Sequence, residues 1–367
     1  MNHAVPDGIV TPAIMIDVDV LDRNIQRMAS SMLSRGLRLR PHVKTHKTLE
    51  IAAKQLAAGA VGLTVATIGE AEVFAAGGAT DIFIAYPLWV EAHHAERLRK
   101  LARTCSIAVG TDSAESATAM GRQLGADARS IDVLIEVDSG HHRSGVLPEE
   151  VVDVARAAAA SGLNIAGVFT FPGHSYKPGM PRDAAGNENE ALGRASAALE
   201  HAGFEVRTIS GGSTPTALLD AETLATELRP GVYVFGDAQQ LELERCTWDD
   251  IALTVAATVV SRHESDGGNV RRVVVDAGSK ILGSDRPDWA TGYGRLPEYR
   301  EARITALSEH HATVVWPDSE ELPALGTRLR LIPNHVCLAM NLVDQVTVVR
   351  AGAVVDTWKV AARGRNN

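Results

Sequence analysis

The sequence predicts an α/β domain followed by a smaller β-rich domain, and three observations carry this prediction. The chain has 367 residues, which is more than the roughly 250 to 300 residues at which one hydrophobic core stops growing. Up to about residue 236, short β-type runs alternate with helical segments, as in repeated βα units around a parallel sheet. Beyond about residue 250 the runs are strand-like with almost no helix between them. We therefore expect the first domain over residues 1–245 and the second over residues 246–367.

The composition is that of an ordinary globular protein, with 45% hydrophobic and 22% charged residues. Its longest largely apolar stretch, residues 251–260, is far shorter than the ~20 residues of a membrane-spanning helix. Residues 1–8 lack the basic and apolar segments of a secretory signal, and three cysteines cannot form a disulfide framework. A net charge of -9 disfavours nucleic acid as a partner. We expect a cytoplasmic protein that binds neither membranes nor nucleic acid.

The first domain contains nine β-type runs: residues 13–18, 37–44, 62–68, 81–86, 106–110, 132–138, 165–171, 205–210 and 231–236. The segments between them carry the alanine, leucine and glutamate of amphipathic helices: residues 49–58, 70–76, 90–103, 113–123, 151–160 and 188–202. A (β/α)8 barrel needs eight strands, so one run is in excess. A closed barrel and an open, doubly wound sheet both fit this alternation.

The second domain contains five strand-like runs: residues 251–262, 270–276, 303–315, 328–333 and 345–360. The last run is interrupted by Ala351 and Gly352, which lie between two β-type segments. A glycine-containing pair between such segments is typical of a hairpin turn.

Lys44 ends a run of alternating apolar residues, 37–44, where a strand would pass into a loop. Its ammonium is therefore expected at a strand mouth and not on a solvated helix face. A desolvated lysine can form a Schiff base with a carbonyl compound. The alternative is a lysine that forms an ion pair with a carboxylate at the strand end.

Glycines and hydroxyl residues follow the eighth run, in the segment Ser210-Gly211-Gly212-Ser213-Thr214. The carboxyl ends of parallel strands carry the sites of barrel enzymes, and phosphate often binds after the last two strands. Two glycines let backbone N–H groups approach an anion, and Tyr233 in the next run adds a phenolic hydroxyl. An ordinary turn is the alternative for Gly-Gly-Ser. A lysine and an anion site on one barrel face are what pyridoxal phosphate requires.

His335 and Cys337 are separated by one residue in the segment Pro333-Asn334-His335-Val336-Cys337. On an extended backbone this spacing places both side chains on one face, roughly 6.5 to 7 Å apart. Imidazole and thiolate are zinc ligands, and catalytic zinc sites leave positions open for water or substrate. Core packing is the alternative for such a pair.

Three further segments follow strand-like runs and mix glycine with ionisable groups: residues 138–145, 173–176 and 276–280. The adjacent histidines His93-His94 and His310-His311 lie in less punctuated stretches. For these two pairs we predict a surface or structural role.

Six of these segments occur together and in one order: residues 41–47, 173–176, 210–213, 231–233, 276–280 and 333–337. In this the chain resembles the D-serine dehydratase and D-threonine aldolase family of fold-type III pyridoxal phosphate enzymes, and the resemblance spans nearly the whole chain. It implies an alanine-racemase-like (β/α)8 TIM barrel followed by a β-rich C-terminal domain. The run at residues 13–18 would then join the β-domain, which accounts for the ninth run.

The resemblance also implies a role for each matching residue. Lys44 matches the catalytic Schiff-base lysine, and His335 and Cys337 match a pair that binds zinc, manganese or magnesium. The residues that match cofactor-binding positions are Lys44, Arg143, His174, Ser175, Tyr176, Gly211, Gly212, Ser213 and Tyr233. The second metal ligand is typically cysteine in the dehydratases and aspartate in the characterised aldolases. The segment Thr170-Phe171-Pro172 departs from the pattern of the relatives.

The function implied is a pyridoxal-phosphate- and divalent-metal-dependent lyase acting on D-3-hydroxy amino acids. A dehydratase of the D-serine or D-threo-3-hydroxyaspartate type would give a 2-oxo acid and ammonia, and a D-threonine aldolase would give glycine and an aldehyde. A racemase is disfavoured because it needs a base on each face and no metal. A non-catalytic pyridoxal phosphate carrier would resemble the barrel alone, so the β-domain speaks against it. The resemblance also implies a homodimer.

Overall fold

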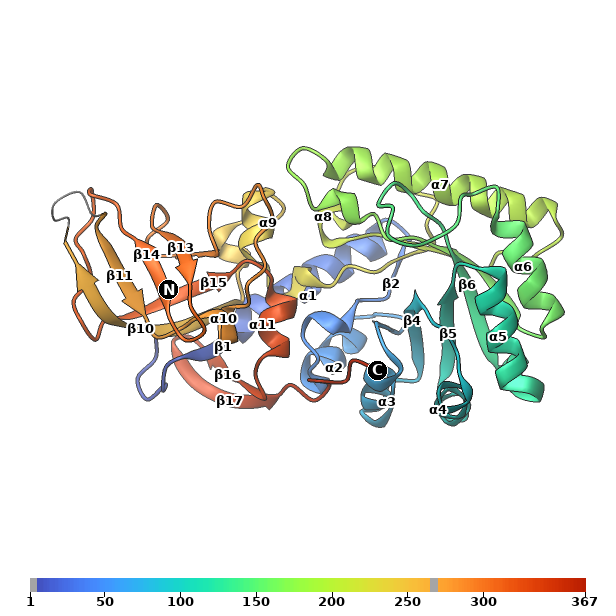
Figure 1. Cartoon of the computed structure of the whole chain (residues 1–367), viewed down its shortest axis with the longest axis horizontal. Helices are drawn as coiled ribbons and strands as arrows, with labels where there is room; N and C mark the ends of the chain where they lie inside the picture. The colour runs from blue at the N-terminus through green and yellow to red at the C-terminus, as the bar shows by residue number, and fades with distance from the viewer. Residues whose placement is uncertain (1–4, 265–269) are drawn as a thin grey trace. The chain divides into compact units, whose positions relative to one another are not determined.

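A computed structural model describes residues 5–264 and 270–367 (Figure 1). The chain forms two compact units. The barrel unit comprises Arg27–Lys44, Ile51–Gly231 and Gly364–Asn367. The β unit comprises Met1–Gln26, Thr45–Glu50 and Val232–Arg363.

The sheet of the barrel unit has eight parallel strands in the order β2-β9-β8-β7-β6-β5-β4-β3. Their bounds are β2 (Arg38–Leu39), β3 (Leu63–Val65), β4 (Asp81–Pro87), β5 (Ser106–Thr111), β6 (Ile131–Glu136), β7 (Asn164–Phe169), β8 (Thr208–Gly211) and β9 (Glu227–Leu228). An isolated parallel bridge between His42 and Thr64 joins the segment after β2 to β3, and so closes the ring. The predicted barrel is confirmed over the open sheet.

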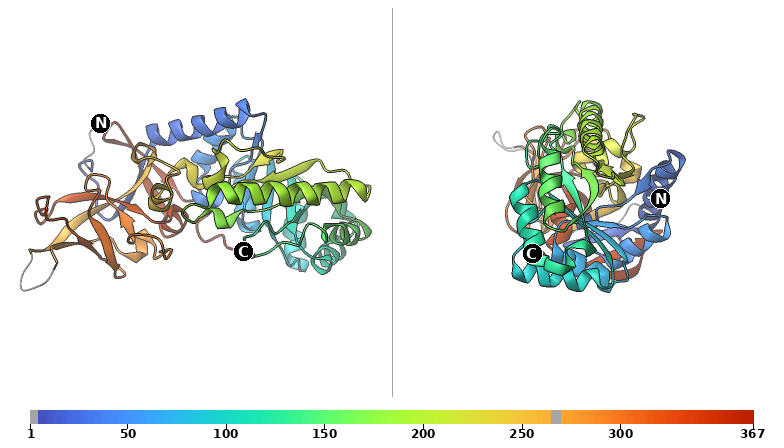
Figure 2. Two further views of the ribbon diagram at one scale, coloured as in Figure 1. Left: turned by 90° about the horizontal axis from the view of Figure 1, so that it is seen from above. Right: turned by 90° about the vertical axis from the view of Figure 1, so that its right-hand side faces the viewer.

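Helices lie around the outside of these strands, as the right-hand view of Figure 2 shows. They are α2 (Leu49–Ala57), α3 (Ile68–Ala76), α4 (Ala92–Ala102), α5 (Ala114–Leu124), α6 (Val151–Ala160), α7 (Pro181–His201) and the short α8 (Thr214–Ala217). Local sequence fixes their starts: the Ser113 side chain accepts the Ser116 N–H at the N-cap of α5. The buried face of α5 is apolar, with Ala117, Met120 and Leu124 fully covered.

The predicted strand at residues 231–236 is wrong. The strand in this region is β9, which ends at Leu228, and Val232–Val234 form the short 3₁₀-helix η4. Pro230 lies two residues after the end of β9. It has no N–H to donate to a neighbouring strand, and it restricts the backbone conformation of the residue before it. The apolar residues after Gly231 are buried in this turn, so their pattern reflects burial and not strand pairing.

The β unit is built on a nine-stranded, mostly antiparallel sheet with the path β13-β14-β11-β10-β1-β16-β17 and with β15 and β12 beside it. Its strands are β1 (Ala13–Asp17), β10 (Leu253–His263), β11 (Arg272–Val275), β12 (Gly294–Arg295), β13 (Arg303–Leu307), β14 (Ala312–Val315), β15 (Arg328–Pro333), β16 (Gln345–Arg350) and β17 (Ala353–Lys359). β1 pairs antiparallel with β10 and parallel with β16, so the first strand of the chain lies inside this sheet. The predicted β-rich second part is confirmed.

Turn chemistry explains the hairpins of the β unit. Ala351 and Gly352 both have positive φ, 49° and 81°, between β16 and β17, as a two-residue hairpin turn requires. The predicted single run at residues 303–315 is instead two strands, β13 and β14, because Ser308 and His311 close a turn with a backbone hydrogen bond of 2.8 Å.

The remaining α-helices among the described residues are α1 (Val18–Ser34), α9 (Ala238–Glu242), α10 (Ser279–Leu282) and α11 (Val336–Asn341). α11 was not predicted, and it follows β15 directly. Within residues 5–264 and 270–367, no helix is both long and apolar enough to cross a membrane.

Candidate active site

Lys44 lies beyond the carboxyl end of β2, in the short 3₁₀-helix η1 (Val43–Thr45), and not in a strand as predicted. Between β2 and η1, the Arg40 N–H donates to the Leu228 carbonyl (3.0 Å), and its side chain bonds with Glu227 (Nε–Oε2, 2.9 Å) and Asp81 (Nη1–Oδ1, 2.6 Å). Lys44 is half-buried. Its ammonium lies 5.9 Å from the centre of the Phe171 ring, so an aromatic face covers part of the amine.

Phe171 brings several predicted site residues together. The Arg143 guanidinium lies 5.3 Å from its ring centre, and the Tyr176 ring lies 6.2 Å away. His141 approaches the same ring edge-on at 5.7 Å. The segment that departs from the family pattern is therefore the centre of the cluster that contains Lys44 and Arg143.

The loop after β8 also joins two predicted residues. Gly212 has a φ of +83°, which favours glycine, and Ser213 is the N-cap of α8. The Ser213 hydroxyl lies 2.9 Å from the hydroxyl of Ser175. The Thr214 hydroxyl is buried and has no hydrogen-bond partner in the part of the chain described here. A buried hydroxyl beside a glycine turn fits a phosphate group, which would accept its hydrogen bond.

His174 lies at the edge of this cluster, in the short 3₁₀-helix η3 (Gly173–Ser175). Its Nε2 lies 3.4 Å from the side-chain nitrogen of Asn187. Burial is the main cause that lowers the pKa of His174. The neutral imidazole is thus favoured at this position.

His42, two residues before Lys44, pairs with Thr64 of β3 in the isolated parallel bridge. Burial, assisted by the positive charges of Lys44 and Arg229, holds the pKa of His42 well below its usual range. Its Nδ1 is buried without a partner among the described residues. A polar atom left unpaired beside Lys44 is a second feature that fits a bound polar group.

Arg229 is a candidate that the sequence reasoning missed. Its guanidinium donates to the Ser210 hydroxyl (2.6 Å) and to the Thr170 carbonyl (2.6 Å), and it lies 5.6 and 5.4 Å from the ring centres of Phe83 and Phe169. It is 5% exposed. A charged residue directly before the Pro-Gly pair at residues 230–231 was the available signal.

The predicted metal pair lies in the β unit and does not sit on one extended strand. His335 has extended dihedrals (φ -137°, ψ 100°) and caps α11, whereas Cys337 lies in its first turn. The His335 Nδ1 lies 2.6 Å from Oδ2 of Asp285, and the Cys337 thiol donates to the Thr45 hydroxyl at 3.3 Å. The prediction of extended geometry at Cys337 is wrong because the helix begins one residue earlier.

Two acidic residues near this pair were not predicted. Asp285 is held by Asn334, whose side-chain nitrogen donates to the Asp285 carbonyl (2.9 Å) and to the Gly292 carbonyl (2.8 Å). Asp237 is buried, accepts the Gln240 and Val336 N–H groups (2.8 and 3.4 Å), and has its pKa raised by burial to about 6.

The charge around His335 favours a cation. Burial of the imidazole disfavours its charged form, but Cys337, Asp285 and Asp237 together raise the pKa of His335 well above its usual value. A position that stabilises an imidazolium also suits a divalent metal, whose charge would replace that proton. The donor set of one imidazole and one thiolate fits such an ion.

Tyr233 lies in η4 of the β unit and is buried. Gly211, Gly212 and Ser213 belong to the barrel unit. The role of Tyr233 in binding the phosphate stays a prediction.

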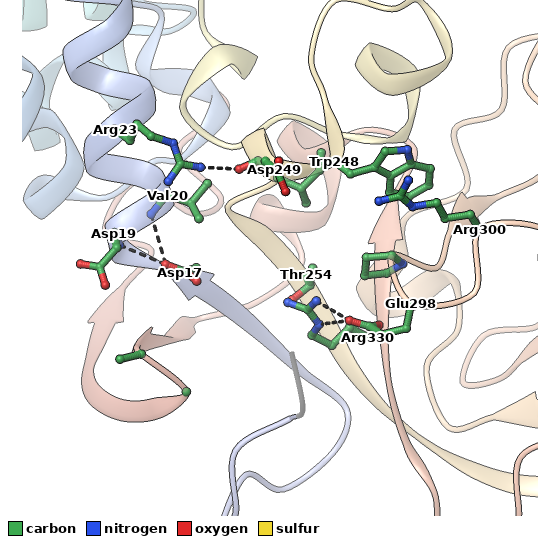
Figure 3. A pocket seen from close by; sticks show the side chains of 14 residues that line it. Asp17, Asp19, Val20, Arg23, Trp248, Asp249, Thr254, Glu298, Arg300 and Arg330 are labelled. Atoms are coloured by element: carbon green, nitrogen blue, oxygen red, sulfur yellow. Dashed lines mark hydrogen bonds and ion pairs between the residues drawn. The ribbon is translucent and has the colours of Figure 1, made fainter. Parts of the chain in front are cut away.

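A pocket of about 610 Å³ in the β unit contains none of the predicted site residues (Figure 3). Its charged groups are largely bonded within the chain: Arg23 donates to the Asp249 carbonyl, and Arg330 forms an ion pair with Glu298. Arg300 stacks on Trp248 at 4.7 Å. We assign no chemistry to this pocket.

Comparison with known proteins covers both parts of the chain. Residues 16–239 match the family model "Alanine racemase, N-terminal domain", and residues 252–349 match "Putative serine dehydratase domain". The chain is 36% identical to D-threo-3-hydroxyaspartate dehydratase of Delftia sp. (strain HT23), over 95% of this chain and 96% of that protein. It is 34% identical to D-threonine aldolase of Arthrobacter sp, over 96% and 93%.

Solved structures agree with these matches. The structure of the Delftia dehydratase superposes with a TM-score of 0.86 at 35% identity, covering 96% of this chain and 97% of that chain. A variant of that dehydratase in the metal-free form gives a TM-score of 0.85 at 35% identity, with the same coverage. D-threonine aldolase from Filomicrobium marinum gives 0.85 at 31% identity, covering 98% of both chains.

Proposed function

Since this chain belongs to the alanine-racemase-like pyridoxal phosphate family of D-threo-3-hydroxyaspartate dehydratase and D-threonine aldolase, we propose that it dehydrates D-3-hydroxy amino acids. The products would be a 2-oxo acid and ammonia. The observation that carries the proposal is the His335–Cys337 pair with its Asp285 partner, in the same chain as the Lys44 cluster. We also propose a homodimer.

The barrel unit would hold pyridoxal phosphate. Lys44 would take its aldehyde, the loop Gly211–Ser213 with the unpaired Thr214 hydroxyl would take its phosphate, and Arg143 would lie near its ring. When bound, the cofactor supplies an electron sink for the charge that develops at the substrate α-carbon. The residues His174, Ser175 and Tyr176 line the same cluster through Phe171 and Ser213.

Lys44 would move the α-proton of the substrate. The amine must be neutral to accept a proton. The Phe171 ring and the Arg143 guanidinium would restrict the directions in which the amine can approach the substrate.

The β unit would hold the metal. Asp285 engages Nδ1 of His335, which leaves Nε2 as the ligand nitrogen. When bound, the ion supplies Lewis acidity that makes a β-hydroxyl a better leaving group. The Cys337 thiolate cannot donate a hydrogen bond, so the Thr45 hydroxyl would turn to donate to it. Thr45 is the residue after Lys44, so the peptide chain itself links the two proposed ligand sets.

Cleavage to glycine and an aldehyde is the second candidate, because the same residues serve it and relatives with that activity are of similar identity. Cys337 favours dehydration, since by resemblance the dehydratases carry cysteine there and the aldolases carry aspartate. A non-catalytic carrier is disfavoured because the match continues through residues 252–349.

Product analysis tests the proposal. Protein supplied with pyridoxal phosphate and zinc, manganese or magnesium would be offered D-serine, D-threonine and D-threo-3-hydroxyaspartate separately. We expect a 2-oxo acid and ammonia in equal amounts from at least one of them, and none from the L-enantiomers. Glycine with an aldehyde as the products would overturn dehydration in favour of the aldolase reaction.

A further inference from the structure

Glu188 is a buried carboxylate beneath the loop proposed to bind phosphate. It projects from α7, is 5% exposed, and accepts the N–H of Gly212 through Oε1. A Cβ at Gly211 would come within 2.9 Å of the Glu188 carboxyl carbon and 3.2 Å of Leu192. A side chain at residue 211 would therefore displace the Glu188 carboxyl group from its place against the loop.

The surroundings of Glu188 offer little compensation for a negative charge. The neighbouring elements β7, β8 and α8 contain no titratable residue. From α6, Asp153 and Arg156 pair with each other at the surface. From η3, His174 contacts the adjacent Asn187.

The positive charge of Arg229 stabilises the ionised form of Glu188 and so lowers its pKa. Its guanidinium already donates to Ser210 and Thr170, and its charge is shared with Glu227 and Glu136. Burial consequently dominates and raises the pKa of Glu188 to about 7, against the Gly212 hydrogen bond and Arg229. Both protonation states are populated near neutral pH.

Two backbone donors of this loop already have partners within the chain. The Ser213 N–H is already committed to the Thr216 hydroxyl (3.0 Å), and Glu188 takes the N–H of Gly212. A phosphate dianion needs such donors, and it is repelled by a second negative charge close by. Protonation of Glu188 removes that charge and weakens its hold on the Gly212 N–H.

We propose that Glu188 is a positioning residue that couples cofactor binding to a proton: its neutral form yields the Gly212 N–H to the cofactor phosphate, and its ionised form retains it. Binding of the phosphate therefore takes up one proton from solvent onto the Glu188 carboxyl group. This inference rests on the proposed function, in which the loop Gly211–Ser213 holds the phosphate of pyridoxal phosphate.

The test is the pH dependence of phosphate-ester binding by cofactor-free protein, measured by calorimetry between pH 6 and pH 9. The probe is 4-deoxypyridoxine 5-phosphate, which lacks the aldehyde and so cannot react with Lys44. Glu188→Gln keeps an acceptor and removes the charge. We expect the ratio of wild-type to variant Kd to rise by about tenfold for each pH unit above the pKa. Glu190→Gln, on the exposed side of α7 beside Arg194, should follow the wild type.

A second measurement needs no variant. Calorimetry of the wild type at pH 8, in two buffers of different ionisation enthalpy, gives the number of protons taken up on binding. At this pH the phosphate is already a dianion, because its second pKa is about 6, so we expect an uptake approaching one proton per site.

No proton uptake, or the same pH dependence of Kd in the wild type and Glu188→Gln, would overturn the role of Glu188 while leaving the phosphate loop in place. Failure of the wild type to bind the probe at any pH would instead contradict the proposed function of the loop.

Discussion

The barrel unit and the β unit assemble their candidate sites in opposite ways. In the barrel unit, Lys44, Arg143, Ser175 and Ser213 come from the ends of different strands and meet around Phe171 and the loop after β8. In the β unit, one five-residue segment supplies both His335 and Cys337, with Asp285 bonded to His335 and Thr45 bonded to Cys337.

This difference agrees with the proposed roles, in which the barrel unit binds the cofactor and the β unit binds the metal. A site gathered from many strand ends encloses a large group and fixes it at several points, as a cofactor requires. A two-residue ligand pair would leave positions of an ion open for water or substrate, as catalytic zinc sites do. Cofactor retention and metal-assisted departure of the hydroxyl should therefore be separable by mutation.

The largest effect is expected from Lys44→Ala. Removal of the amine would take away both the proposed attachment point of the cofactor and the proposed base, so turnover should fall by roughly 10³- to 10⁴-fold. The visible absorbance of the bound cofactor should shift or vanish. Lys177→Ala, at an exposed lysine of the same unit, should change neither quantity. Retention of the absorbance in Lys44→Ala would place the cofactor attachment elsewhere.

Cys337→Ala should impair metal binding without affecting cofactor binding. Loss of the thiolate would weaken binding of the proposed metal ion, whose assistance to the departing hydroxyl is worth several kcal/mol, or about 10³-fold in turnover. The cofactor absorbance should remain as in the wild type. Cys246→Ala serves as the control within the β unit, and unchanged turnover in Cys337→Ala would contradict the metal role.

Asp285→Asn should reduce metal binding by the His335–Cys337 pair, with a smaller effect than Cys337→Ala. The amide does not hold Nδ1 of His335 as a carboxylate does, so metal affinity should fall by about 10- to 100-fold. Competition with a chelator measures it, and excess metal should restore turnover. Asp288→Asn, exposed in the same loop, is the matched control. Equal affinities for Asp285→Asn and the wild type would show that Asp285 does not support the ligand.

The smallest effect is expected from Phe171→Leu. A cation over an aromatic ring contributes about 0.5 to 1 kcal/mol at a partly exposed site, so loss of the ring should lower turnover by less than about tenfold. Phe171→Tyr should retain most of it. A loss as large as that of Lys44→Ala would mean that Phe171 contacts the reacting groups directly.

Local residue patterns were sufficient to predict most of the barrel strands and the last hairpin. The alternation of runs gave seven of the eight barrel strands within a few residues, and the Ala351-Gly352 turn gave the last hairpin. Lys44 and the His335–Cys337 pair stood out because each lies in a short segment of unusual composition after a strand-like run.

Two contacts that were not predicted join residues far apart in sequence. Glu188 acts on Gly212 from 24 residues away, and Arg229 bonds to Thr170 from 59 residues away. No local pattern marks such pairs. The wrong strand at residues 231–236 arose because burial alone produces the same apolar pattern as pairing in a sheet.

The most direct test of the central claim is to remove the metal and return it within one sample. Protein with bound pyridoxal phosphate would be treated with a chelator, and 2-oxo acid formation and cofactor absorbance would be followed together, before and after zinc, manganese or magnesium is added. We predict that the chelated protein keeps its absorbance and loses turnover, and that the metal restores turnover in the wild type but not in Cys337→Ala. Full turnover in the chelated protein, or loss of the cofactor absorbance with the metal, would contradict the division between the two units.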